Sequence, residues 1–346
     1  MDKRLTYVVL LNWRGWRDTI ACLQSLFSST GSRYRVIVCD NASGDGSLDR
    51  IESWARGAID ADIPDQPRLA SLVAAARSRP RYTRINRRVA ESGAFRATCP
   101  LLLVDNGGNL GFAAGNNVGL RLALSQPDMD SVWLLNNDTV VDRGCLASMR
   151  GELQAANGHA VVGSVIHFFD RPEIIQALGG NRFNRLTGVA SCSEGRFLHE
   201  SSLPLQRHSG AELDYLSGCS LLLPRRFLEE VGLMSEDYFL YYEEIDWFTR
   251  AAGRFPIRVA VGAHLYHREG SAIGSRSWRR AASLLSDYHM QRSRLIFMRK
   301  HYPRRVAGCY LAGLVDTAKR VARGQFGNAR TVVSVLLGRR GPWVPA

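Results

Sequence analysis

The sequence lacks the cysteine patterns that staple a small secreted domain or hold a structural metal ion. Its seven cysteines are odd in number and scattered, and no two of them form a C-x-x-C pair. This distribution argues against a disulfide framework and against a zinc site. It is compatible with a reducing compartment, so we expect an intracellular protein.

Long apolar runs and a secretory leader are missing as well. No apolar run reaches the ~18 residues that a bilayer-spanning helix needs, and the first residues lead directly into a strand pattern. We therefore expect a cytoplasmic protein. Any membrane contact would be peripheral, on the inner face of the plasma membrane.

Acidic residues are scarce at the C-terminal end of the chain. The segment from Arg268 to Ala346 contains 16 Lys or Arg residues but only three Asp or Glu residues, and it accounts for the whole formal net charge of +13. Such an asymmetry indicates a region that meets an anionic partner, either a phospholipid surface or nucleic acid. A solvated basic face without a partner would show the same composition.

The remaining composition fits a globular α/β protein. The 346 residues are 45% hydrophobic and 22% charged, enough for one large domain or for one domain with an appendage. Helical spacing at residues 18–28 separates two strand-like runs, which predicts a right-handed parallel crossover. Short apolar runs typical of strands buried on both faces occur at residues 5–11, 34–39, 101–104 and 132–135.

Two stretches interrupt the strand and helix pattern. Residues 56–99 are rich in arginine and show little periodicity, so we interpret them as an insertion that leaves the sheet. Residues 170–209 are polar and poor in strand signals, and we interpret them as a variable loop system that faces a substrate.

Polar side chains follow the predicted strands where each strand ends. Open α/β sheets bind ligands in the crevice beyond the carboxyl ends of their strands. Asp40 ends the second strand, where an acid can accept a hydrogen bond from a ribose, although its neighbours would equally suit an Asx turn. Asp138 follows Asn136 and Asn137 after the run VWLL, and it could bind a hard cation such as Mg²⁺ or simply belong to a turn.

A glycine-rich stretch at residues 105–117 separates a strand from a helix and contains Asn116. Glycines here would let the backbone approach a ligand, and the helix N-terminus would attract phosphate. The spacing matches neither a Walker motif nor G-x-G-x-x-G, which argues against an NTPase and against a dehydrogenase.

Three acids crowd into the segment DYFLYYEEIDWFTR, namely Glu243, Glu244 and Asp246. A carboxylate among apolar neighbours holds its proton more tightly, which a general base near neutral pH requires. The alternative is a helix N-terminus that favours acids. Further on, His267 follows a predicted strand and could complete a metal or diphosphate site, although a lone histidine is more often structural.

Six stretches in this order resemble family 2 glycosyltransferases of the GT-A fold, and most closely their rhamnosyltransferase-like branch, which builds bacterial surface polysaccharides. Together they cover about residues 7–271, apart from the arginine-rich insertion and the 170–209 loop. The matching stretches are VVLLNWRGWRDTIACLQSL, VIVCDNASGDGS, NLGFAAGNNVGL, WLLNNDTVVD, GCSLLLPRRFLEEVGLMSEDYFLYYEEIDWFTRA and AHLYHREGS.

The resemblance implies a fold and a domain arrangement. It implies a Rossmann-like, mostly parallel sheet flanked by helices in a catalytic domain over residues 1–271. Residues 272–346 would form a basic helical appendage. Within it, residues 292–321 mix apolar and cationic residues at helical spacing, as an interfacial amphipathic helix does on an anionic membrane.

The resemblance also implies a role for each candidate residue. Asn12 and Asp40 would line the nucleotide pocket, and Asn116 would face the nucleotide sugar. Asn137 and Asp138 match the metal-binding motif, in which Asp138 is the ligand and His267 lies near the metal and the diphosphate. Glu244 matches the acceptor-activating base. This chain departs from the family in having Asn-Asn-Asp for Asp-x-Asp and glutamate at the base position, which leaves Asp246 and Glu243 as alternative bases.

The implied reaction transfers a sugar from a nucleotide diphosphate to a hydroxyl. One base and no obvious nucleophile predict single displacement with inversion, with Mg²⁺ or Mn²⁺ neutralising the leaving diphosphate. The expected donor is a dTDP- or UDP-sugar, best rhamnose, and the acceptor is a saccharide or a lipid-linked saccharide. No nucleic acid partner is expected. The alternatives are a sugar nucleotidylyltransferase and a non-enzymatic protein that binds an anionic surface.

Overall fold

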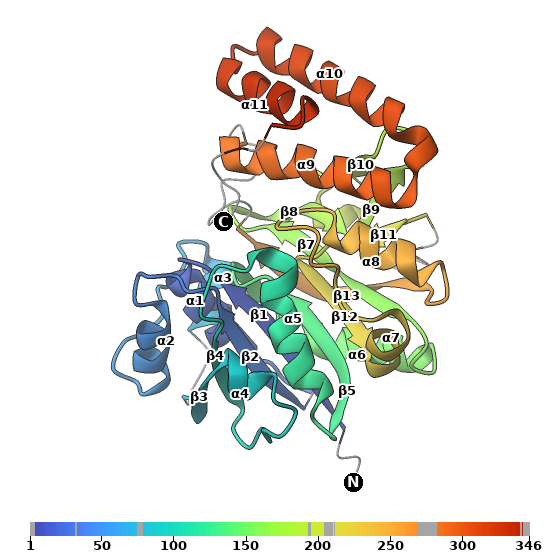
Figure 1. The fold of residues 1–346 in the computed structure, drawn as a ribbon. Coiled ribbons are helices and arrows are strands. Elements are labelled where there is room, and N and C mark those ends of the chain that lie inside the picture. The colour runs from blue at the N-terminus through green and yellow to red at the C-terminus, as the bar shows by residue number, and fades with distance from the viewer. Residues whose placement is uncertain are drawn as a thin grey trace.

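A computed structural model describes residues 4–31, 33–74, 79–192, 195–203, 210, 212–268, 282–339 and 341. Strands and helices alternate along the first half of the chain and build a central sheet. Three helices are stacked beyond the carboxyl ends of its parallel strands (Figure 1). Within the described residues the main sheet has ten strands and a second sheet has three.

The main sheet is mostly parallel, as expected. Its order is β3 (Tyr82–Asn86), β4 (Leu101–Asp105), β2 (Tyr34–Asp40), β1 (Leu5–Asn12), β5 (Met129–Leu135), β12 (Ser220–Pro224), β7 (Val161–Phe168), β13 (Ile257–His267) and β6 (Thr139–Val141). The first five are parallel, whereas β12 runs antiparallel between β5 and β7. The registers pair Asn12 with Asp40 and Asp40 with Asp105, so these strand ends lie level.

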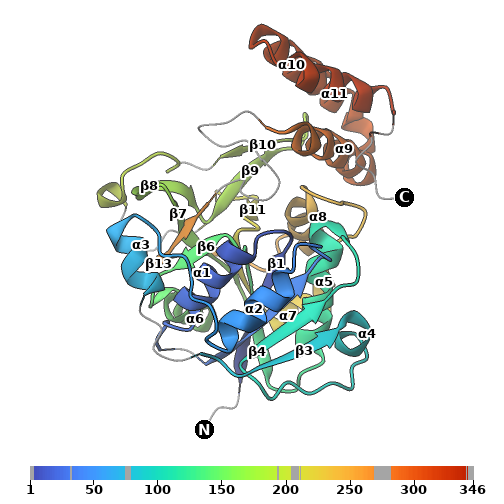
Figure 2. The ribbon, with the colours of Figure 1, turned by 90° about the vertical axis from the view of Figure 1, so that its left-hand side faces the viewer.

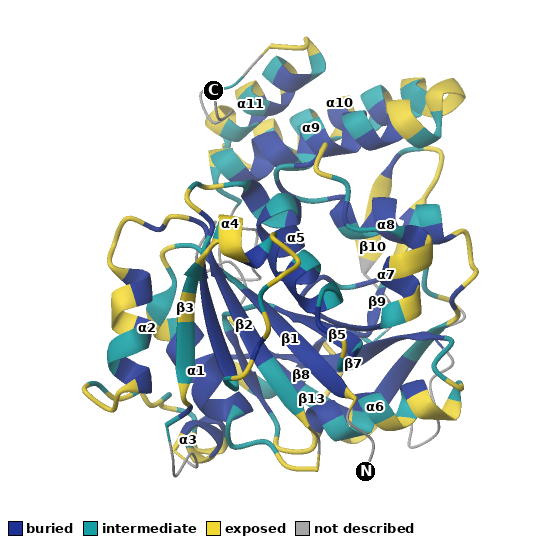
Figure 3. Ribbon diagram, turned by 60° about the horizontal axis from the view of Figure 1, so that its bottom comes forward, coloured by how far each residue is buried: buried dark blue, intermediate teal, exposed yellow. Residues whose placement is uncertain are grey.

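Helices cover both faces of this sheet because the central strands are apolar on both sides. Val8 and Leu10 of β1 pack with α1 (Trp16–Leu26), α2 (Ser47–Ala55) and α6 (Cys145–Ala155). Val9 lies on the opposite side and packs with α5 (Gly111–Leu124), α7 (Arg225–Val231) and α8 (Glu243–Ala251). Side chains that alternate between two buried faces explain the unbroken apolar runs of the sequence. Figure 3 shows the central strands buried.

The arginine-rich residues 56–99 do not leave the sheet altogether, so this part of the sequence interpretation is wrong. They contain α3 (Pro67–Val73) and α4 (Arg87–Ala90), but β3 pairs in parallel with β4 and forms an edge of the main sheet. An edge strand has only one neighbour, so β3 carries exposed and half-buried residues rather than an apolar run.

Residues 170–209 also differ from the expected loop system. They contain β8 (Arg171–Leu178), which pairs with β7, and the strands β9 (Gly180–Asn184) and β10 (Val189–Cys192). The smaller sheet has the order β10-β9-β11, with β11 at Tyr215–Leu216. These strands are short and largely polar outside β8, which hides them from a search for apolar runs.

The basic C-terminal region is helical where the structure describes it, in α9 (Leu284–His301), α10 (Val306–Ala322) and α11 (Phe326–Leu336). The expected single amphipathic helix over residues 292–321 is wrong, because the chain turns at Tyr302 and Pro303. Two views at right angles place α9 beyond the carboxyl ends of the parallel strands, with α10 and α11 outside it (Figures 1 and 2). No helix in the described ranges has both the length and the apolar composition to cross a bilayer.

Candidate active site

Asn12 and Asp40 meet at the level ends of β1 and β2. Asn12 Nδ2 donates to Asp40 Oδ1 at 2.5 Å, and Asp40 also accepts from the backbone N–H and the hydroxyl of Ser43. Asn12 is fully buried and Asp40 is 4% exposed. The buried side chains of Asn12 and Asp40 therefore hold the loop after β2 against the ends of β1 and β2.

The end of β5 is tied to the same network through Asn137. Its Nδ2 donates to Thr19 Oγ1 at 2.8 Å and lies 3.3 Å from Asn12 Oδ1. Gly15 leaves room for this amide, since a Cβ there would lie 3.0 Å from Asn137 Nδ2. The three predicted residues Asn12, Asp40 and Asn137 thus form one connected cluster.

Asp138 and His267, the predicted metal pair, lie side by side. Asp138 Oδ1 is 3.2 Å from His267 Nε2, because β13 brings the histidine to the turn that follows β5. His267 Nδ1 lies 3.0 Å from Gln176 Oε1 of β8, which can only accept, so this nitrogen carries the proton. Burial by itself would lower the pKa of His267, but the Cys219 thiol and the Asp138 carboxylate raise it well above its ordinary value.

The donors of this pair fit a divalent cation that a substrate helps to hold. A metal-ligating imidazole usually donates its other ring N–H to an oxygen, and Gln176 supplies that acceptor. Mg²⁺ commonly takes one or two protein carboxylates and completes its shell with phosphate and water. In the part of the chain that the structure describes, no group of three or more His, Cys, Asp or Glu side chains could hold a metal ion.

Glu243 and Glu244 open α8 and differ in exposure. Glu243 is 2% exposed, and its Oε2 has no hydrogen-bond partner among the described residues. Burial and the neighbouring Glu244 carboxylate raise the pKa of Glu243 well above its ordinary value. Glu244 is half-buried, and burial raises its pKa too, against hydrogen bonds from the backbone of Glu244 and Gly218. Of these two glutamates, Glu244 is the one whose side chain is partly exposed.

The loop at residues 217–219, between β11 and β12, joins the two halves of the site. Glu244 packs directly on Gly218, where an added Cβ would lie 1.8 Å from Glu244 Oε1. The next residue, Cys219, accepts from the backbone N–H of Asn136 at 2.9 Å and lies beside the His267 ring. Glu244 therefore contacts this loop at Gly218, and His267 of the Asp138–His267 pair contacts it at the next residue, Cys219.

Asp246 has a different role from Glu244, although it is only two residues away. It is fully buried and bonds to Arg250 Nε at 2.7 Å, His301 Nε2 at 2.7 Å and Lys300 Nζ at 3.1 Å. Burial would raise the pKa of Asp246, but hydrogen bonds from His301, Arg250 and Lys300 lower it below its ordinary value. A carboxylate held by two cations, Arg250 and Lys300, is a poor base, and Asp246 instead joins α8 to α9.

Replacing Asp246 should therefore affect stability. We expect Asp246→Asn to lower the free energy of unfolding at pH 7 by about 3 kcal/mol, since it breaks a buried ion-pair cluster. The folded-state pKa is depressed, so the contribution of Asp246 is complete above its unfolded pKa and is lost as the pH falls. The difference in the free energy of unfolding between Asp246→Asn and the wild type should become smaller below about pH 4. Chemical denaturation at several pH values measures this.

Asp237 provides the matched control for that experiment. It also binds Lys300, at 2.8 Å, but its side chain is 55% exposed. Exposed ion pairs contribute at most about 1 kcal/mol. An Asp237→Asn variant as unstable as Asp246→Asn would contradict the assigned difference between the two acids.

Asn116 lies on α5, and the hydrogen bond of its side chain stays within that helix. It is 2% exposed, and its amide donates to Phe112 O on its own helix, α5. The glycines around it do allow close packing, because a Cβ on Gly115 would lie 2.7 Å from the Asn41 amide. The role of Asn116 towards a nucleotide sugar stays a prediction.

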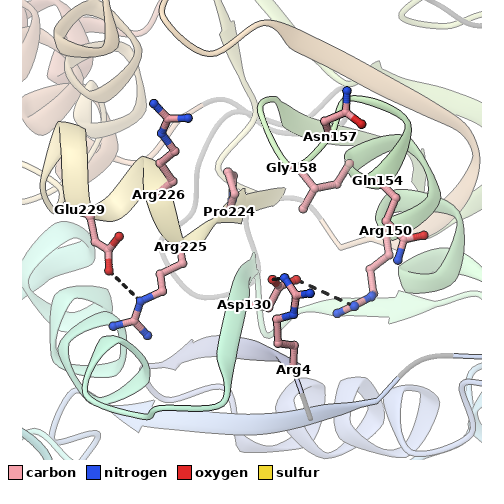
Figure 4. A pocket seen from close by; sticks show the side chains of 11 residues that line it. Arg4, Asp130, Arg150, Gln154, Asn157, Gly158, Pro224, Arg225, Arg226 and Glu229 are labelled. Carbon is pink, nitrogen blue, oxygen red and sulfur yellow. Dashed lines mark hydrogen bonds and ion pairs between the residues drawn. The ribbon is translucent and has the colours of Figure 1, made fainter. Parts of the chain in front are cut away.

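A cavity of about 450 Å³ lies away from these residues. Figure 4 shows it lined by Asp130 of β5, Pro224 of β12 and several arginines. These belong to the amino end of β5 and the carboxyl end of the antiparallel β12, opposite the edge where Asn12 and Asp40 meet. Its arginines already pair with acids, Arg4 with Asp130 at 3.7 Å and Arg225 with Glu229 at 2.7 Å.

Sequence reasoning missed Gln176, Gly218 and Cys219. Gln176 lies on β8, inside the stretch taken for a loop, so no signal marked it. Gly218 and Cys219 belong to the stretch YLSGCSLLLP, where the apolar core residues drew attention. A glycine and a cysteine just before a buried strand were the available signal of a close contact.

Comparisons with known proteins agree with this architecture. No protein-family model matches the sequence. A low-salt glycan biosynthesis hexosyltransferase, Agl10 of Haloferax volcanii, is 26% identical over 152 residues, which are 43% of this chain and 45% of that protein. The solved structure of GalNAc-T7 with UDP, GalNAc and Mn²⁺ is 12% identical, with a TM-score of 0.55, over 86% of this chain and 48% of that one.

The chain has the GT-A fold. It spans less than half the length of the hexosyltransferase and of the GalNAc-T7 chain. A mannosyltransferase of Pyrobaculum calidifontis, solved with GDP-Man and Mn²⁺, is 14% identical with a TM-score of 0.49, over 97% of this chain and 76% of that one.

Proposed function

We propose that this protein is an inverting glycosyltransferase that moves a sugar from a nucleoside diphosphate donor to an acceptor hydroxyl. The observation that carries the proposal is the arrangement around residues 217–219. Glu244, a half-buried glutamate of raised pKa, packs on Gly218, and the ring of His267, which pairs with Asp138, lies beside the next residue, Cys219. Sugar transfer requires these two functions at one place.

Glu244 would act on the acceptor. Its carboxylate takes the proton of the attacking hydroxyl while the oxygen bonds to the anomeric carbon, and the bond from that carbon to the diphosphate breaks. Attack from the face opposite the leaving diphosphate inverts the anomeric centre. The raised pKa of Glu244 makes it a stronger base than an ordinary glutamate near neutral pH.

Asp138 and His267 would act on the diphosphate. A Mg²⁺ or Mn²⁺ ion held by them would neutralise the charge that the leaving group develops. Gln176 would fix the His267 ring, so that Nε2 points to Asp138. Asn12, Asp40 and Asn137 would hold the strand ends that face the nucleotide.

The finer assignments rest on the resemblance of the six sequence stretches. We propose a dTDP- or UDP-sugar donor with rhamnose as the best sugar, and a saccharide or lipid-linked saccharide acceptor of cell-surface polysaccharide. The similarity to the hexosyltransferase Agl10 supports a hexosyl donor. The GalNAc-T7 structure, which holds UDP and Mn²⁺, supports a nucleotide donor and a divalent cation.

Thermal stabilisation by a panel of nucleoside diphosphates and nucleotide sugars, with and without Mg²⁺ or Mn²⁺, tests the proposal. A ligand that binds only the native state raises the melting temperature. We expect one base to stabilise the protein in a metal-dependent way, and the matching sugar donor to be consumed when an acceptor is added. Stabilisation by nucleoside triphosphates and sugar phosphates instead would favour a nucleotidylyltransferase, and no stabilisation at all would overturn the site.

Gly218 allows a steric test of the same arrangement. We expect Gly218→Ala to lower kcat at least ~10-fold with little change in donor affinity, because the new Cβ displaces the Glu244 carboxylate from its place. Steady-state kinetics measure this. Gly151→Ala on α6 is the matched control, since a Cβ there meets no atom within 4 Å. If the two substitutions lowered kcat equally, the assigned contact of Gly218 with the catalytic carboxylate would be contradicted.

A further inference from the structure

The outermost helices, α10 and α11, have their apolar side on the surface. On α10 the exposed positions recur at helical spacing, and every exposed large hydrophobic residue of α10 lies among them. The apolar ones are Ala307, Leu311, Leu314, Val315, Ala318, Val321 and Ala322, and Lys319 is exposed between them. Leu311 is 63% exposed and Leu314 is 57% exposed. A helix that packs on a core normally has the opposite arrangement.

The polar side of α10 faces inwards, towards α9. Asp316 accepts from Arg294 at 3.2 Å, and Arg320 binds Asp287 at 2.5 Å. These partly buried ion pairs fix the orientation of α10, and the same contacts turn its apolar side outwards. A group of exposed apolar residues on a helix whose orientation is fixed indicates a surface that binds a partner.

The neighbouring helix α11 also has exposed apolar residues. Its exposed residues Phe326, Val333 and Leu337 lie on one side of the helix, with Arg330 among them, whereas Ala329, Val332 and Val335 are buried. Phe326 and Leu337 are 66% and 64% exposed. We call the exposed apolar residues of α10 and α11, named in this and the first paragraph, the apolar face.

Cations surround the apolar face. Within the described residues none of them forms an ion pair, and Asp316, which Arg294 holds, is the one acid of the two helices. The exposed cations are Arg304, Arg305, Lys319, Arg323, Arg330 and Arg339. Apolar residues flanked by unpaired cations are what binding to an anionic lipid surface requires.

We propose that the apolar face of α10 and α11 docks on the surface of an anionic lipid membrane. A second copy of this chain is disfavoured as occupant, because it would bring the same cations together without acids to match them. Nucleic acid would pair with the cations but would leave the leucines exposed to water. A membrane satisfies both, since headgroups take the cations and acyl chains take the leucines.

Docking here would hold the candidate active site near the lipid headgroups. The helices α9, α10 and α11 lie beyond the carboxyl ends of the parallel strands, where the candidate site also lies (Figures 1 and 2). A lipid-linked acceptor would be within reach of Glu244, and this consequence alone rests on the proposed function. The docking itself is measured without nucleotide or turnover, so its failure and that of the transferase assignment can be told apart.

Co-sedimentation of the full chain with phosphatidylcholine vesicles, with and without 30% phosphatidylglycerol, tests the proposal at low salt. We expect binding to the anionic vesicles and little binding to the neutral ones. Arg323→Gln together with Arg330→Gln should weaken binding roughly 30-fold, at about fivefold for each cation. Leu311→Glu together with Leu314→Glu should weaken it at least ~10-fold.

Ile63→Glu provides the matched control, because Ile63 is 53% exposed and lies outside α9 to α11. We expect this variant to bind vesicles as the wild type does, and all variants to keep the melting temperature within a few degrees. Absence of binding to the anionic vesicles would overturn the proposal. Vesicle binding that is unchanged by the leucine substitutions would overturn it too. The same holds if the protein sediments as a dimer that Leu311→Glu and Leu314→Glu dissociate.

Discussion

Glu244→Gln should lower kcat about 10²–10⁴-fold and leave the affinity for the donor nearly unchanged. The amide keeps the shape of the side chain against Gly218 but cannot take the proton of the acceptor hydroxyl. Single-turnover sugar transfer, with donor binding followed separately by thermal stabilisation, measures the two effects.

The pH dependence of sugar transfer provides a second test of Glu244 as the base. Because burial raises the pKa of Glu244, the wild type should lose activity on acidification at a pH above that of an ordinary glutamate, about 4.3. The residual activity of Glu244→Gln should lack this dependence, since no group at that position titrates.

Glu243→Gln is the comparison that could contradict this assignment. Glu243 is 2% exposed, so we expect its substitution to leave most of the turnover in place. Its raised pKa means that ionised Glu243 destabilises the fold above the unfolded pKa, and the variant should therefore gain stability at neutral pH. Loss of turnover in Glu243→Gln, with Glu244→Gln active, would assign the base to Glu243.

Asp138→Asn should remove the metal-dependent part of the stabilisation by a nucleoside diphosphate and lower kcat at least ~100-fold. The substitution preserves the shape of the side chain but removes the charge that faces His267 at 3.2 Å. Titration of Mn²⁺ in the presence of the diphosphate, followed by thermal shift, separates lost metal binding from general destabilisation.

Asp142→Asn is the matched control for Asp138→Asn. Asp142 lies four residues further along the same stretch, where its side chain accepts from the backbone N–H of Arg143. We expect this variant to keep the metal dependence of the wild type. If Asp138→Asn kept it too, the cation would have to be held elsewhere and the Asp138–His267 pair would be an ion pair only.

The central strands could be predicted from the sequence because their physics is local. Each of β1, β2, β4 and β5 is buried on both faces, and such burial requires an unbroken apolar run that any reader of the chain can see. The residues that follow these runs lie at the carboxyl ends of parallel neighbours, which is why Asn12, Asp40 and Asn137 lie together.

Edge and surface strands could not be predicted in the same way. β3 and β9 have polar or half-buried residues because each has solvent or a loop on at least one side. Their strand character comes from hydrogen bonds to a neighbouring strand that is distant in sequence. This is why Gln176, on β8, was not recognised as the partner of His267.

The sequence by itself determined the mostly parallel sheet, the row of polar residues at its carboxyl edge, and the excess of positive charge at the C-terminal end. Only the tertiary structure decided how neighbouring residues divide the work. Glu244 and Asp246 differ by about 200° around α8. Lys300 and His301 of α9 bind Asp246, whereas Glu244 lies beside Gly218. In the same way, contacts with α9 turn the apolar side of α10 outwards. Composition reports which residues are available, but contacts between distant segments decide which face each of them occupies.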